Sequence, residues 1–76
     1  AYQRELAATL VADLRLPADS LCVDIGSNDG TLLRGLADAG MRTIGVEPTN
    51  IASFARSNHG IETVQAFFTE EIARSI

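Results

Sequence analysis

The feature that most constrains the fold is the regular alternation of strand-like and helix-like segments along the chain. Short apolar runs rich in β-forming residues are separated by segments whose apolar residues recur at helical spacing. The predicted helices cover residues 2–14, 30–39 and 50–58 and resume after 68, and the predicted strands are 21–25, 42–47 and one within 61–68. Strands that alternate with helices through tight connections indicate a parallel sheet with right-handed crossovers.

The ends of the predicted helices carry residues that are typical of helix ends. Pro17 closes the first helix, Gly40 and Gly60 stand where left-handed C-terminal caps are expected, and Thr69 can cap the last helix. The order is therefore α-β-α-β-α-β-α. Three parallel strands make half of a doubly wound sheet, so we predict an α/β fold, the N-terminal half of a Rossmann-like doubly wound parallel sheet. On this interpretation residues 1–76 are an incomplete part of a larger domain.

Charge and cysteine content exclude several classes of function. The chain has six basic residues, all arginine and spread singly, against ten acidic ones, and its net charge of −4 argues against a nucleic-acid partner. Cys22 is the only cysteine, which excludes an internal disulfide and a cysteine-based metal site and suits a reducing compartment. No apolar run approaches the roughly 18 residues of a membrane span. The charged start has no signal-peptide core, so we expect a soluble, cytoplasmic chain.

A glycine-containing loop, "GSNDG", follows the first predicted strand. Gly26 comes directly after the strand and Gly30 enters the next helix. In an open α/β sheet, ligands lie beyond the carboxyl ends of the strands. Gly26 has no Cβ, so a ligand can approach its backbone closely and the turn can take a positive φ. Amides at the following helix N-terminus favour an anionic or strongly polar group of a ligand.

Two acidic residues extend this pattern. Asp24 lies near the end of the first strand, where it can face a donor or a positive charge of a ligand. Glu47 ends the second strand, 47 − 26 = 21 positions after Gly26. An acid about 20 residues past the loop is placed to accept hydrogen bonds from ribose hydroxyls. Each feature alone also has a structural interpretation, but together they predict a nucleotide cofactor.

The loop does not match the usual dinucleotide fingerprint, G-x-G-x-x-G. Asn28 replaces the middle glycine, and Asp29 adds negative charge where a pyrophosphate would lie. Asp24 adds more. A phosphate-free cofactor with a cationic end suits these carboxylates better, and S-adenosylmethionine carries an ammonium, a sulfonium and an adenosine ribose.

These residues resemble a known family. "VDIGSNDGTLL" resembles motif I of the class I S-adenosylmethionine-dependent methyltransferases, and "IGVEP" resembles their second motif. The "GSNDG" loop, "GVEP" and "AFF" are most similar to the bacterial sugar C-methyltransferases, which act on nucleotide-linked deoxysugars. The resemblance covers nearly all of residues 6–76, and its most specific part is about 15 residues long.

The resemblance implies a set of cofactor-binding residues. Around the methionine end it implies Asp24, Gly26, Ser27, Asn28 and Gly30. It also implies that Glu47 binds the ribose hydroxyls, that Pro48 lies beside the adenine, and that the Phe67 segment closes its other side. Related enzymes often carry an acid for the adenine amino group after the third strand. Here Ala66 precedes Phe67, so adenine would depend on backbone contacts and apolar packing.

The expected activity follows from the same resemblance. Transfer of a methyl group to carbon needs a base, and no convincing base is found in these residues, so we assign no catalytic residue and no metal ligand. We expect the S-adenosylmethionine-binding portion of a methyltransferase, inactive alone, whose partners are a small-molecule substrate and the remainder of a parent chain. Two alternatives stay open. One is a nicotinamide-dinucleotide-binding module of an oxidoreductase, and the other is a non-catalytic α/β interaction domain.

Overall fold

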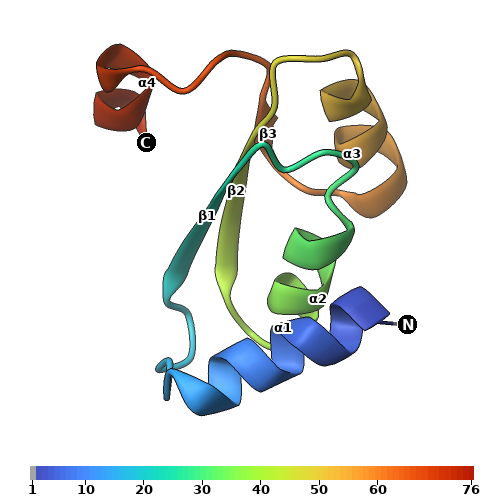
Figure 1. The fold of residues 1–76 in the computed structure, drawn as a ribbon, viewed down its shortest axis with the longest axis vertical. Coiled ribbons are helices and arrows are strands. Elements are labelled where there is room, and N and C mark those ends of the chain that lie inside the picture. The colour runs from blue at the N-terminus through green and yellow to red at the C-terminus, as the bar shows by residue number, and fades with distance from the viewer. Residues whose placement is uncertain (1) are drawn as a thin grey trace.

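The computed structural model describes residues 2–76, with side chains from Glu5 onward, and has an α/β architecture (Figure 1). The elements follow in the order α1 (Tyr2–Asp13), β1 (Leu21–Ile25), α2 (Thr31–Asp38), β2 (Arg42–Val46), α3 (Ile51–His59), β3 (Thr63–Val64) and α4 (Glu70–Ser75). The three strands form one parallel sheet in the order β1-β2-β3. The predicted class and element order are therefore confirmed, and the arrangement is compatible with part of a Rossmann-like sheet.

Strand β3 is shorter than the apolar run that predicted it. Only Thr63 and Val64 form it, because Ala66 N donates to Val64 O at 3.1 Å and turns the chain out of the strand direction. The side chain of Arg56 donates to Thr63 O at 2.8 Å on the edge away from β2. A basic side chain thus occupies the outer edge of this short strand, a common way to protect an edge from further pairing.

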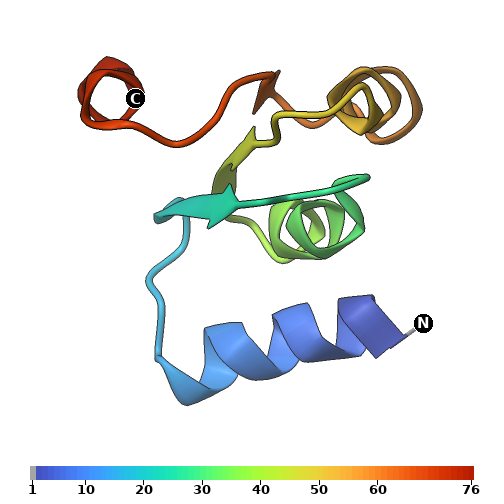
Figure 2. The ribbon, with the colours of Figure 1, turned by 45° about the horizontal axis from the view of Figure 1, so that its top comes forward.

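The core lies between the sheet and the helices that cover one of its faces. Its buried apolar residues are Ala7, Leu33, Leu36, Met41 and Ile61, with Val11, Leu16 and Cys22 packed partly against them. Helix α1 packs on α2, and α4 lies apart from the other three helices in both ribbon views (Figures 1 and 2). None of the helices described between residues 2 and 76 has the length and apolar character that crossing a bilayer requires.

The side chains of β1 show that helices cover only one face of this strand. Cys22 packs against the core, whereas Leu21, Val23 and Ile25, on the opposite face, are 43%, 39% and 58% exposed. Because the sheet is parallel, β1 and β2 end at the same edge, where each chain continues into a connection to a helix. Most of the predicted site residues lie on these two connections, whereas Asp24 lies within β1 and Phe67 follows β3.

Candidate functional site

The loop from Gly26 to Gly30 folds back onto the end of β2. Gly26 N and Ser27 N both donate to Val46 O, at 2.7 and 3.2 Å, and Gly30 N donates to Ser27 O at 3.1 Å. Gly30 has φ of 83°, and a Cβ there would lie 3.1 Å from the Cβ of Ala55. A glycine at this position therefore allows both the left-handed turn and the close approach of α2 to α3.

Glu47 joins this loop to the connection that follows β2. The residue is only 7% exposed, and its Oε1 accepts from Asn28 N at 2.9 Å. Its Oε2 accepts from Thr49 N at 3.0 Å and from Thr49 Oγ1 at 2.7 Å. These donors, the Thr49 hydroxyl foremost, hold the pKa of Glu47 below its ordinary value. The carboxylate is thus ionised at neutral pH, and it fixes Asn28, whose φ is 57°.

Asp29 stabilises the start of α2. Its Oδ1 accepts from Thr31 Oγ1 at 2.7 Å and from Thr31 N at 3.0 Å. These two bonds lower the pKa of Asp29, and the nearby His59 adds a smaller effect in the same direction. A negative charge beside a helix N-terminus is favourable, so this carboxylate has a structural role that the spacing of the loop did not reveal.

Asp24 differs from the other two carboxylates. Its side chain is half-buried, and among the described residues it has no hydrogen-bond or ion-pair partner. Burial raises its pKa above the ordinary value, because removal from water disfavours the charged form. The carboxyl end of β1 therefore presents an acid whose ionised state a cationic or donor group would stabilise.

The Ser27 side chain is turned beneath the loop. The residue is 5% exposed, and its Oγ is buried without a hydrogen-bond partner. A Cβ at Gly45 in β2 would lie only 2.4 Å from this Oγ. A ligand contact by the Ser27 hydroxyl stays a prediction, and the hydroxyl would have to turn away from Gly45 to make it. A glycine inside a strand often marks the close approach of another part of the chain, so Gly45 was the sequence signal for this packing of Ser27.

The residues predicted to contact adenine, Pro48 and Phe67, lie outside the hydrogen-bonded loop. Pro48 is half-buried and directly follows Glu47. Phe67 is 76% exposed, in the segment that leads from β3 away to α4 (Figure 1). The structure thus links Gly26, Asn28, Gly30 and Glu47 through the hydrogen bonds of the loop, whereas Phe67 packs on little. Contacts of Pro48 and Phe67 with adenine stay predictions.

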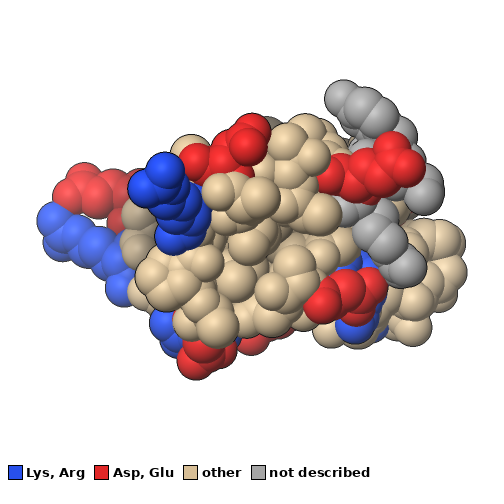
Figure 3. All heavy atoms as spheres, turned by 90° about the horizontal axis from the view of Figure 1, so that it is seen from below, with Lys and Arg blue, Asp and Glu red and all other residues tan. Residues whose placement is uncertain are grey.

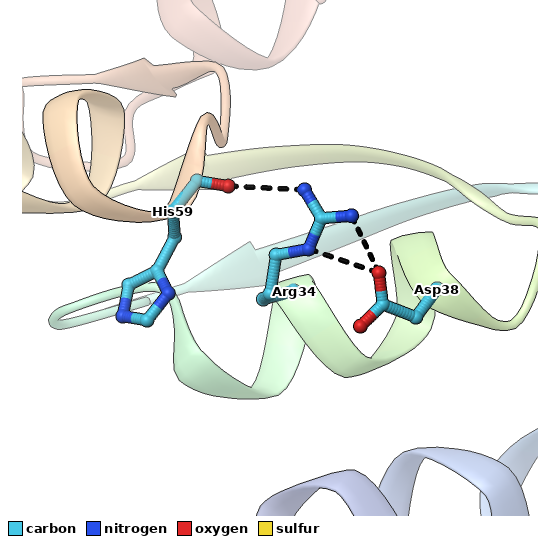
Figure 4. Close-up of polar contacts among 3 residues, drawn as sticks. All are labelled: Arg34, Asp38 and His59. Atoms are coloured by element: carbon cyan, nitrogen blue, oxygen red, sulfur yellow. Dashed lines mark hydrogen bonds and ion pairs between the residues drawn. The ribbon is translucent and has the colours of Figure 1, made fainter.

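Arg34 fixes the two helices that flank the loop. Its Nη1 donates to His59 O at 3.1 Å, at the C-terminal end of α3, and its Nε donates to Asp38 at 3.0 Å (Figure 4). A cationic side chain at a helix C-terminus satisfies an exposed carbonyl and opposes the negative end of the helix dipole. The contact therefore helps to hold α3 beside α2, whose first residue follows the loop.

Other surface features do not compete with this site. A hollow of about 380 Å³ is lined by Glu70, Glu71 and Arg74, three exposed residues of the six-residue helix α4, and by none of the predicted site residues. Figure 3, a view of the molecule from below, shows basic and acidic side chains interspersed, with no basic patch on the face in view. Among residues 5–76, no group of three or more His, Cys, Asp or Glu residues is arranged to hold a metal ion.

Comparison with known proteins relates the chain to a methyltransferase. No protein-family model matches the chain. The chain is 33% identical over 75 residues to C-methyltransferase NovU of Streptomyces niveus, and the alignment covers 99% of this chain but 18% of that protein. The chain thus spans less than a fifth of the length of its relative. This similarity supports a methyltransferase-like relationship.

Proposed function

We propose that the chain is the S-adenosylmethionine-binding portion of a methyltransferase. The observation that carries this proposal is the pair of acids at the ends of β1 and β2. Glu47 is held ionised at 7% exposure and is bonded to the glycine loop, and Asp24 is half-buried without a partner. In the proposal Asp24 receives the ammonium group of the methionine end, and Glu47 accepts from the ribose. Gly26, Ser27, Asn28 and Gly30 line the methionine end, and Pro48 and Phe67 flank the adenine.

The hydrogen bonds of the loop favour this cofactor over a dinucleotide. A pyrophosphate binds to free backbone amides at such a loop. Here the amides of Gly26 and Ser27 donate to Val46 O, that of Asn28 donates to Glu47, and that of Gly30 donates to Ser27 O. Few donors remain for a phosphate, and three carboxylates surround the loop. A ligand with one cationic end and a diol complements these groups better.

The proposed role of these residues is to bind and orient rather than to transfer protons. S-Adenosylmethionine supplies an electrophilic methyl group, and methyl transfer depends mainly on holding donor and acceptor in line. The acceptor that we propose is a small molecule, a nucleotide-linked sugar methylated at carbon. The relative's name, C-methyltransferase, supports transfer to carbon, and the resemblance of the "GSNDG", "GVEP" and "AFF" motifs to the bacterial sugar C-methyltransferases supports the sugar. In the proposal, the base and the acceptor site lie on other parts of a longer polypeptide, and this portion alone is inactive.

Binding of S-adenosylhomocysteine to the full-length protein, measured by isothermal titration calorimetry, tests the proposal. Glu47→Gln and Asp24→Asn should each weaken binding about tenfold, as expected for the loss of one charge-assisted contact. Glu62→Gln removes the charge of an exposed acid outside the site and is the matched control. NAD is the comparator ligand. Binding of NAD in place of S-adenosylhomocysteine, or equal effects of all three substitutions, would refute the proposal.

A further inference from the structure

The Glu47 carboxylate has almost no free capacity to accept hydrogen bonds. Two carboxylate oxygens offer about four lone-pair positions. Oε2 already accepts twice, from Thr49 N at 3.0 Å and from Thr49 Oγ1 at 2.7 Å. Oε1 accepts once, from Asn28 N at 2.9 Å. One position on Oε1 is therefore left for a ligand, although a ribose diol brings two hydroxyl groups.

The Thr49 hydroxyl is the donor that can leave. The other two donors are backbone amides, held by the loop after β1 and by the connection between β2 and α3. The Thr49 side chain is exposed, so its hydroxyl can rotate about χ1 and bond to water instead. Apart from Glu47, this hydroxyl has only a long contact, in which Ile51 N donates to it at 3.4 Å.

We propose that Thr49 is a specificity-determining residue whose hydroxyl occupies the place of the second ribose hydroxyl on Glu47 and leaves it when a diol binds. This inference rests on the proposed function of the site. It means that the free protein keeps Glu47 satisfied and oriented by an internal substitute for the ligand. Binding of a diol then has to displace that substitute, whereas a ligand with one hydroxyl can use Oε1 alone.

Thr49→Val and Thr49→Ser separate this competition from a merely structural role. Valine has nearly the shape of threonine and keeps the backbone N–H that donates to Oε2, but it removes the competing hydroxyl. Serine keeps the hydroxyl and serves as the matched control. The ligands are S-adenosylhomocysteine and its 2′-deoxy and 3′-deoxy analogues, titrated calorimetrically into the full-length protein.

We expect Thr49→Val to bind S-adenosylhomocysteine about tenfold tighter than the wild type, because the diol no longer has to displace a charge-assisted hydrogen bond from the ionised carboxylate. Binding of the two deoxy analogues should change less than about twofold, so discrimination in favour of the diol increases. Thr49→Ser should match the wild type. Weaker binding of all three ligands by Thr49→Val would show that Thr49 only positions Glu47, and an unchanged discrimination ratio would also overturn the inference.

A second readout needs no ligand. The carboxyl ¹³C signal of Glu47, followed by NMR against pH, should report a higher pKa in Thr49→Val than in Thr49→Ser, because only the serine retains the hydroxyl donor. An unchanged pKa would overturn the inference, since the hydroxyl would then not occupy the carboxylate. Failure of the wild type to bind S-adenosylhomocysteine would instead refute the proposed function together with this inference.

Discussion

Gly45→Ala should displace the glycine loop through a single methyl group. Gly45 is the fourth of the five residues of β2, and its φ is not in the positive region, so alanine fits the backbone. The added Cβ would lie 2.4 Å from Ser27 Oγ, 3.0 Å from Ser27 Cβ and 3.2 Å from Leu33 Cδ1. Rotation of the Ser27 hydroxyl relieves only the first contact. The loop itself must therefore move away from β2.

The expected cost is that of an overpacked core, about 1–3 kcal/mol in the free energy of unfolding. Movement of the loop also lengthens the bonds from Gly26 N and Ser27 N to Val46 O, so binding of S-adenosylhomocysteine should weaken as well. Urea denaturation of the full-length protein and calorimetric titration measure the two effects.

A double-mutant cycle with Ser27→Ala tests the reasoning. Because Ser27 Oγ is buried without a partner, Ser27→Ala alone should be neutral or stabilising rather than costly. It should also reduce the cost of Gly45→Ala by about 1 kcal/mol, since the closest contact is removed. Effects that add within about 0.3 kcal/mol would refute the steric argument. A clear loss of stability in Ser27→Ala would show that the hydroxyl has a partner after all.

Three further predictions concern charge. Asp24→Asn should raise the thermal midpoint of the ligand-free protein at neutral pH, because burial penalises the ionised acid, and it should weaken binding of S-adenosylhomocysteine. A lower midpoint would contradict this. Glu47 and Asp29 have pKa values below their ordinary 4.5 and 3.8, so their stabilisation is present above those values and is lost as the pH falls through the lower folded-state values. Urea midpoints between about pH 5 and pH 2 should therefore fall less steeply in Glu47→Gln than in the wild type, and parallel profiles would argue against this linkage. Arg34→Met should cost about 1 kcal/mol by urea denaturation, whereas Arg74→Met, which breaks an exposed pair on α4, should cost less; equal costs would mean that the bond to α3 contributes nothing.

Much of the fold could be predicted from local pattern. The strand predicted at 21–25 has those bounds in the structure, and the helices predicted at 30–39 and 50–58 run over Thr31–Asp38 and Ile51–His59. The spacing of apolar residues predicts which face of a helix is buried, and Gly60 indicates the left-handed cap that ends α3. The third strand lies within residues 61–68 as predicted, but the apolar run did not give its bounds, because the turn after Val64 depends on backbone geometry that an apolar run does not encode.

The site was less predictable, because its contacts join segments that are distant in the sequence. The bond between Asn28 N and Glu47 spans 19 positions, and the close approach of Ser27 to Gly45 joins the loop after β1 to β2. Composition indicated that the acids were present but not what they bind within the chain. Thr49 was missed for the same reason. Its sequence signal was a hydroxyl residue two positions after a strand-end acid, a spacing that permits a local turn but does not require one.

The three carboxylates around the loop differ in what they still need, and this difference limits the ligands that fit. Asp29 is satisfied by Thr31, and most of the acceptor capacity of Glu47 is taken by Asn28 and Thr49. Asp24 alone is half-buried and without a partner among the described residues, so its ionised form stands to gain most from a cation. A ligand that brings one positive charge and one diol would bind at both, with the charge at Asp24, one hydroxyl on the open position of Glu47 Oε1 and the other in place of the Thr49 hydroxyl. A pyrophosphate would meet neither and would add two negative charges beside three others.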